Sequence, residues 1–166
     1  MADQFAVDMT MMPHPNWNIK FNNFFRTGDG WLIGTGPNQV SQFDRDFYVN
    51  TLKISGLVIE NLELSANFQL AILEAKTQDV FQVQEQGLQQ LQGVNTDIED
   101  KRFSFQLKLR YRLGAYSDIY LVYGRGGTDK AQPDEEFASK PWLRSLNDMW
   151  QQPTNSFLTA KVRYLF

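Results

Sequence analysis

Hydrophobic and polar residues alternate along most of this chain, and the alternation is most regular in residues 103–113. The odd positions there are Phe103, Phe105, Leu107, Leu109, Tyr111 and Leu113, and the even positions are Ser104, Gln106, Lys108, Arg110 and Arg112. Successive side chains of an extended strand point to opposite faces, so this pattern predicts a strand with one apolar face and one polar face.

Six further segments show a similar alternation. They are residues 4–12, 16–26, 43–55, 61–75, 116–125 and 156–166, of which 43–55 is the least regular. Gly114 and Ala115 lie between the segments 103–113 and 116–125 and predict a tight hairpin. The sequence therefore predicts a single all-β domain over residues 1–166, with about seven antiparallel strands.

The connections between the predicted strands alternate in length. Short connections lie near Pro13, Gly56 and Gly114, while the long ones cover residues 27–42, 77–100 and 126–155. Within the first long connection, residues 31–33 are candidates to extend the strand pairing. In an antiparallel series, this places every long connection at one end of the sheet. Such asymmetry is typical of outer-membrane β-barrels, which have short periplasmic turns and long external loops.

Two of the long connections are expected to contain short helices. The glutamine-rich connection at 77–100 predicts one near residues 86–91. The third connection has apolar residues at helical spacing, namely Trp142, Leu143, Leu146, Met149 and Trp150. This second helix is expected to pack on the rim of the sheet, and the alternative is that Trp142 and Trp150 bind a partner.

The last strand suggests where lipid lies. One side carries the apolar series Leu158, Ala160, Val162, Tyr164 and Phe166. The other side carries Lys161 and Arg163, and Lys108, Arg110 and Arg112 also lie opposite an apolar face. A cation facing midplane lipid would cost about 2–4 kcal/mol. These five cations are therefore expected in a wet lumen.

A half-exposed soluble sheet would alternate in the same way, but it would explain neither the loop asymmetry nor the terminal phenylalanine.

Strand length agrees with the membrane interpretation. Eleven residues in extended conformation span about 37 Å, and a tilt of about 40° projects this onto roughly 28 Å. The apolar band of an outer-membrane barrel is about 25 Å tall. No run approaches eighteen consecutive apolar residues, so a transmembrane helix is excluded.

Composition narrows the range of functions. Hydrophobic residues make up 42% of the chain and charged residues 21%, so a folded domain is expected. A net charge of -3 gives no sign of the positively charged surface with which proteins bind nucleic acid. The chain has no cysteine, and its one histidine, His14, lies between two prolines. We therefore expect no catalytic residues, metal site or cofactor.

The strand count suggests that these residues form part of a larger barrel. If Phe166 lies on the periplasmic side, counting back through seven strands places residue 1 outside, whereas a complete bacterial barrel usually has an even number of strands. Either residues 31–33 form a hidden eighth strand, or the chain is the C-terminal part of a larger barrel. The N-terminus lacks the features of a signal peptide, which favours the second explanation.

Residues 110–123, with the reversal Leu113-Gly114-Ala115-Tyr116-Ser117-Asp118, and residues 157–166 resemble the C-terminal end of a bacterial outer-membrane protein family. Members of that family carry an N-terminal domain similar to family 9 carbohydrate-binding modules ahead of a large barrel. The resemblance implies a bacterial outer-membrane location. The N-terminal domain has no counterpart in this sequence.

The terminal strand also resembles the signal that the barrel-assembly machinery reads on its clients. On this interpretation Phe166 and Tyr164 are the anchor positions, and the alternative is that they are interface aromatics of the periplasmic girdle. Deleting Phe166 is expected to impair insertion, measured as the fraction of protein assembled into the membrane. Unchanged assembly would remove the recognition role.

Three functions remain open. The leading prediction is an outer-membrane barrel that transports solutes or forms a porin-like pore with a partly cationic lumen. The second is a closed barrel that anchors a surface complex, with other surface or barrel subunits as partners. The third is a soluble ligand-binding β-barrel. The first two imply outer-membrane lipid and the assembly machinery as partners.

Overall fold

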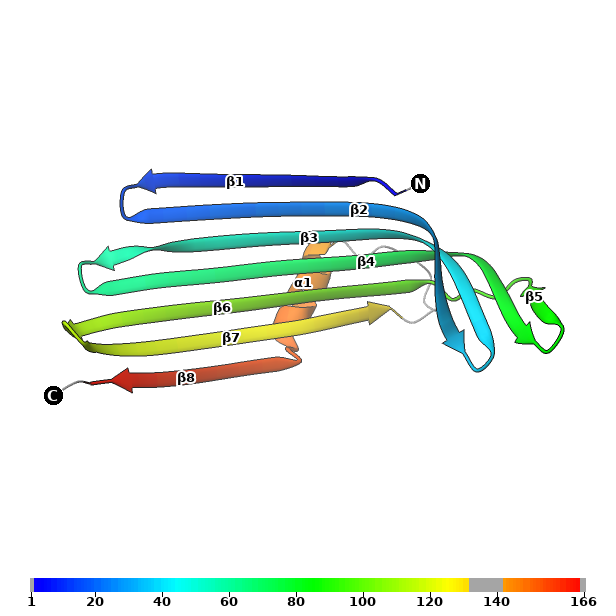
Figure 1. The fold of residues 1–166 in the computed structure, drawn as a ribbon. Helices are drawn as coiled ribbons and strands as arrows, with labels where there is room; N and C mark the ends of the chain where they lie inside the picture. Colours follow the sequence, from blue (N-terminus) through cyan, green and yellow to red (C-terminus); the bar gives the residue numbers. More distant parts are fainter. Residues whose placement is uncertain (1, 132–141, 165–166) are drawn as a thin grey trace.

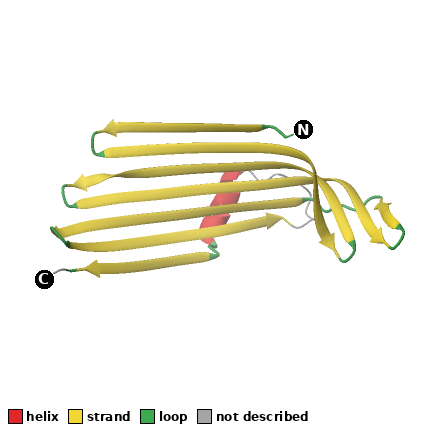
Figure 2. Cartoon of the chain, in the orientation of Figure 1, coloured by secondary structure: helices red, strands yellow, loops and turns green. Residues whose placement is uncertain are grey.

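The computed structural model describes residues 2–131 and 142–164, which form one antiparallel β-sheet with a single helix against it (Figure 1, Figure 2). The elements are β1 (Gln4–His14), β2 (Trp17–Gly36), β3 (Gln39–Ile59), β4 (Leu62–Gln84), β5 (Gly87–Leu91), β6 (Ile98–Gly114), β7 (Ser117–Ala131), α1 (Trp142–Gln151) and β8 (Asn155–Arg163). The all-β class and the seven predicted strands are confirmed, and β5 is an additional short strand.

The strands follow one another across the sheet in nearly sequential order. The order is β1-β2-β3-β4-β6-β7-β8, and β5 pairs with β4 outside this path. Every pairing is antiparallel. Within the described part of the chain the sheet is not closed, because β1 and β8 each have one neighbour. Six antiparallel steps separate β1 from β8, so these two edge strands run in the same direction.

The predicted asymmetry of the connections is confirmed. Tight turns join β1 to β2, β3 to β4 and β6 to β7 at one end of the sheet, on the left in Figure 1. The extended connections all lie at the opposite end. We call these the tight-turn end and the extended end.

Two predictions about the long connections were wrong. Residues 27–42 are mostly strand instead of loop, with a turn at Pro37 and Asn38. Residues 31–33 extend the pairing of β2 with β3, which was one of the two expectations for them, and do not form a separate strand. Residues 86–91 contain the whole of strand β5 and one residue of the turn before it, and do not form a helix. Pairing with a neighbouring strand outweighs local composition here, and a bulge between Gly28 and Trp31 accommodates the glycines.

The third long connection is partly as predicted. The helix expected from the spacing of its apolar residues is confirmed as α1. Residues 126–131, which were expected to begin this connection, lie inside β7, however, because β7 pairs with β6 as far as Ala131. Among the described residues, no helix is long and apolar enough to cross a membrane.

The two faces of the sheet differ in polarity across its whole width. One row of facing residues runs through all seven long strands and is entirely nonpolar or aromatic: Met11, Ile19, Ile54, Ala66, Leu107, Tyr123 and Leu158. A row on the other side consists mostly of polar residues: Asn18, Ser55, Ser65, Lys108, Val122 and Thr159. We call these sides the apolar face and the polar face.

Little of the apolar face is covered within the described part of the chain. Helix α1 packs on it, where Met149 is buried against Leu70 and Phe103. The Trp150 ring lies 5.7 Å from the ring of Phe103 and 5.6 Å from that of Phe105. Elsewhere the face is open: Leu158, for example, is 67% exposed. A sheet normally buries such a face against another layer, so this surface requires a further cover.

A network of hydrogen bonds between side chains holds the extended end together. Ser41 is fully buried and its hydroxyl lies 2.8 Å from that of Thr35 and 3.0 Å from that of Thr96. Thr77 hydrogen-bonds to both Thr96 and Asp97. These contacts attach the segment between β5 and β6 to the hairpin of β2 and β3.

Candidate functional site: a charged cluster on the polar face

The five basic residues predicted to share one face are brought together at the tight-turn end of the sheet. Arg110 of β6 faces Tyr120 of β7, which in turn faces Lys161 of β8. In the next row toward the tight turn, Arg112 faces Asp118, which faces Arg163. Lys108 lies on the same face, one row farther from the tight turn than Arg110. We call these residues, with Glu63 of β4, the charged cluster.

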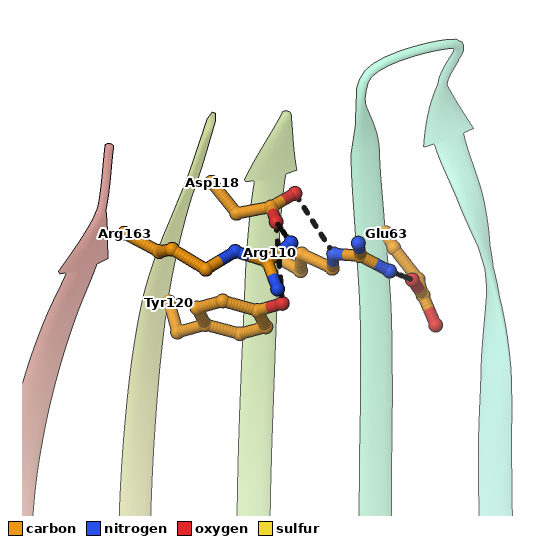
Figure 3. A network of polar contacts seen from close by, with 5 residues as sticks. All are labelled: Glu63, Arg110, Asp118, Tyr120 and Arg163. Carbon is orange, nitrogen blue, oxygen red and sulfur yellow. Dashed lines mark hydrogen bonds and ion pairs between the residues drawn. The ribbon is translucent and has the colours of Figure 1, made fainter. Parts of the chain in front are cut away.

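Asp118 lies at the centre of the charged cluster and is 2% exposed. Arg110 donates from Nε to its Oδ1 over 3.1 Å, and Arg163 donates from Nη2 to its Oδ2 (Figure 3). One carboxylate therefore links β6, β7 and β8. Charged partners make such hydrogen bonds stronger than neutral ones.

Glu63 and Tyr120 extend the charged cluster. Glu63 Oε2 lies 3.6 Å from Nη1 of Arg110, so the ion pairs reach β4. The guanidinium of Arg110 lies 5.6 Å from the centre of the Tyr120 ring, within cation-π range. Arg110 is thus held by two carboxylates and an aromatic ring (Figure 3).

The other three cations are available to solutes. In residues 2–131 and 142–164, neither Lys108, Arg112 nor Lys161 forms an ion pair. Lys108 and Arg110 line a pocket of about 210 Å³ with Glu63, Ser65 and Tyr120. With five basic side chains against two carboxylates, the charged cluster favours anions. The same described ranges contain no group of three or more histidine, cysteine, aspartate or glutamate residues that could hold a metal ion.

Sequence reasoning found the basic residues but missed the ion pairs. Alternation along β7 places Asp118 opposite the apolar series, so its face was predictable. Its partners were not, because Arg163 is 45 positions away in sequence and the contact depends on the register of β7 with β8.

Asp118→Ala is expected to loosen β8, because Arg163 and Arg110 lose their shared acceptor. Amide hydrogen exchange should become faster in residues 155–163. Asp100→Ala is the matched control, since Asp100 accepts its hydrogen bonds from Arg102 within the same strand. Equal exchange in β8 for wild type and Asp118→Ala would show that the linkage does not hold the edge strand.

The residues predicted as an assembly signal lie at the exposed edge of the sheet. Leu158, Ala160 and Val162 lie on the apolar face of β8, and Tyr164 follows the end of that strand. Phe166 lies outside the described residues. Recognition of these side chains by assembly machinery stays a prediction.

Trp150 occupies a structural position. Besides its contacts with Phe103 and Phe105, its ring lies 4.9 Å from the guanidinium of Arg125, which also donates to its backbone carbonyl. Helix α1 thus packs on the sheet, but it lies across the apolar face and not on the rim where it was expected (Figure 1). The side chain of Trp142 lies outside what the structure describes, and a partner contact for either tryptophan stays a prediction.

No protein-family model, curated protein or solved structure matches this chain.

Proposed function

We propose that this chain is an outer-membrane β-barrel protein whose apolar face contacts lipid and whose polar face lines a lumen that passes or binds anionic solutes. The observation that carries the proposal is the single-layer sheet with one nonpolar row across seven strands. In water such a sheet would leave most of its apolar face uncovered. In a bilayer the hydrocarbon core supplies the cover.

The positions of the charges support this orientation. Lys108, Arg110, Arg112, Lys161 and Arg163 share the polar face, and turning that face to lipid would cost about 2–4 kcal/mol for each cation near the midplane. The tight turns correspond to the periplasmic end in this proposal, and the extended end corresponds to the outside.

The direction of the edge strands bears on how the barrel closes. Because β1 and β8 run in the same direction, joining them directly would create a parallel pair. A fully antiparallel barrel requires an odd number of additional strands between them. This fits the larger barrel that the family resemblance implies, and those strands would also satisfy the free backbone groups of both edges.

Fractionation tests the proposal directly. The protein should sediment with the outer membrane, resist extraction by urea, and dissolve only when detergent is added. Folded barrel should also migrate differently from boiled protein in gel electrophoresis. A protein that is soluble and folded without detergent would contradict the proposal and support a soluble ligand-binding barrel.

Conductance tests the charge of the lumen. Channels of the whole protein in planar bilayers are expected to prefer chloride over potassium, and replacing both Lys108 and Lys161 with glutamine should reduce that preference. The charge-matched control is Gln84→Glu with Gln86→Glu, at the β4–β5 hairpin, which should leave the preference largely unchanged. Preference for cations in the wild type would contradict an anion-selective lumen.

An anchor for a surface complex is the second candidate function. The observation in its favour is that the β2–β3 and β4–β5 hairpins both project beyond the rest of the sheet at its extended end (Figure 1). A barrel that inserts into membranes but never conducts would favour this function over transport.

A further inference from the structure

The apolar face contains a groove over β2, β3 and β4. Its volume is about 560 Å³. At the end nearer the tight turns it is lined by Phe21, Leu52 and Phe68, which face one another across the three strands. Leu70 and Ile72 continue the nonpolar lining along β4. The shape and lining suit a hydrocarbon chain lying along the strands.

One polar residue lies in the middle of the groove, and its hydrogen bonding is internal. Asn50 accepts a hydrogen bond from the side chain of Asn23 on β2 over 2.5 Å. This pairing lowers the cost of placing an amide on a nonpolar surface. The middle of the groove therefore offers no acceptor that calls for a charged ligand.

The end of the groove nearer the extended end is different. Tyr48 and Glu74 line it, and no described side chain forms a hydrogen bond or ion pair with either. Asp46 faces Glu74 on the neighbouring strand, so two carboxylates lie side by side. The nearby Lys101 forms an ion pair with Glu99. This end of the groove is therefore rich in acceptors and negatively charged.

From this combination we infer that the groove binds a membrane lipid whose acyl chain lies along Leu52, Phe68 and Leu70 and whose ammonium headgroup is held by Glu74 and Tyr48. An ammonium supplies both the positive charge and the donors that these two groups lack. The inference rests on the proposed membrane orientation, in which the carboxylates lie at the headgroup level, where the nonpolar lining ends.

Lipid retention tests this inference. The whole protein is purified in detergent, mixed with equal amounts of phosphatidylethanolamine and phosphatidylglycerol that carry the same acyl chains, and examined by native mass spectrometry. The wild type should retain one phosphatidylethanolamine in preference to phosphatidylglycerol. Glu74→Gln should weaken that preference about tenfold, the effect of losing one charge-assisted hydrogen bond.

Two further variants make the result specific. Ile72→Trp fills the groove and should abolish retention of both lipids while Glu74 remains. Glu85→Gln makes the same charge change as Glu74→Gln in the turn between β4 and β5 and should bind like the wild type. Equal retention of the two lipids by the wild type, or an unchanged preference in Glu74→Gln, would overturn the inference.

A separate measurement distinguishes failure of this inference from failure of the proposed function. Flotation of each variant with liposomes reports membrane insertion independently of lipid retention in detergent. Insertion without any headgroup preference would overturn the lipid site and leave the barrel proposal standing. Failure of the wild type to float would overturn the membrane orientation and with it a lipid site at headgroup level.

Discussion

Leu121→Lys is expected to prevent stable insertion of most of the protein, whereas the same substitution at the neighbouring Val122 should be tolerated. Leu121 lies on the apolar face of β7 and Val122 on the polar face. A lysine facing lipid near the midplane costs about 2–4 kcal/mol, while one that faces a wet lumen costs little.

The two variants add the same charge at adjacent positions, so they serve as controls for each other. The measurement is the fraction of protein that folds into liposomes, read from the gel shift between unboiled and boiled samples. If Val122→Lys failed and Leu121→Lys inserted normally, the two faces would be assigned the wrong way round. Equal behaviour of both variants would contradict a bilayer on either face.

Gly127→Ala is expected to displace α1 from the sheet. A Cβ atom at this position would lie 2.6 Å from Cε1 of Phe103 and 2.7 Å from the backbone carbonyl oxygen of Met149. A backbone atom cannot rotate away as a flexible side chain can, so the helix must shift. Overpacking of this kind costs about 1–3 kcal/mol.

Two readouts check the prediction for Gly127. The urea midpoint of unfolding in detergent should fall, and proteolytic cleavage within residues 142–151 should become faster. Gly114→Ala is the matched control, since a Cβ atom at Gly114 meets nothing within 4 Å. Wild-type cleavage of Gly127→Ala would mean that α1 does not depend on this close approach.

Several features could be predicted from sequence because they depend on local alternation. The strand at residues 103–113 and the face of each of its side chains follow from a period of two. The gathering of the long connections at one end follows from counting antiparallel strands. The helix followed from the spacing of Leu146, Met149 and Trp150, since a 3.6-residue period needs no knowledge of the remaining fold.

The misjudged segments show where local pattern is insufficient. Residues 27–42 are rich in glycine, a poor strand former, and residues 77–100 are polar and rich in glutamine, yet both segments are largely paired in the structure. Backbone hydrogen bonds to a neighbouring strand outweigh a propensity that spans only about 1 kcal/mol. The residue pattern of one segment does not reveal which strand it will pair with.

The sequence by itself determined the all-β class, the two faces and the asymmetry of the connections, because each depends on residues close together in the chain. Only the tertiary structure decided which residues meet. The contact of Asp118 with Arg163, the close approach of α1 at Gly127 and the groove over β2, β3 and β4 all depend on the register between strands. Register aligns residues distant in sequence, and a shift by one position would move every side chain of a strand to the opposite face.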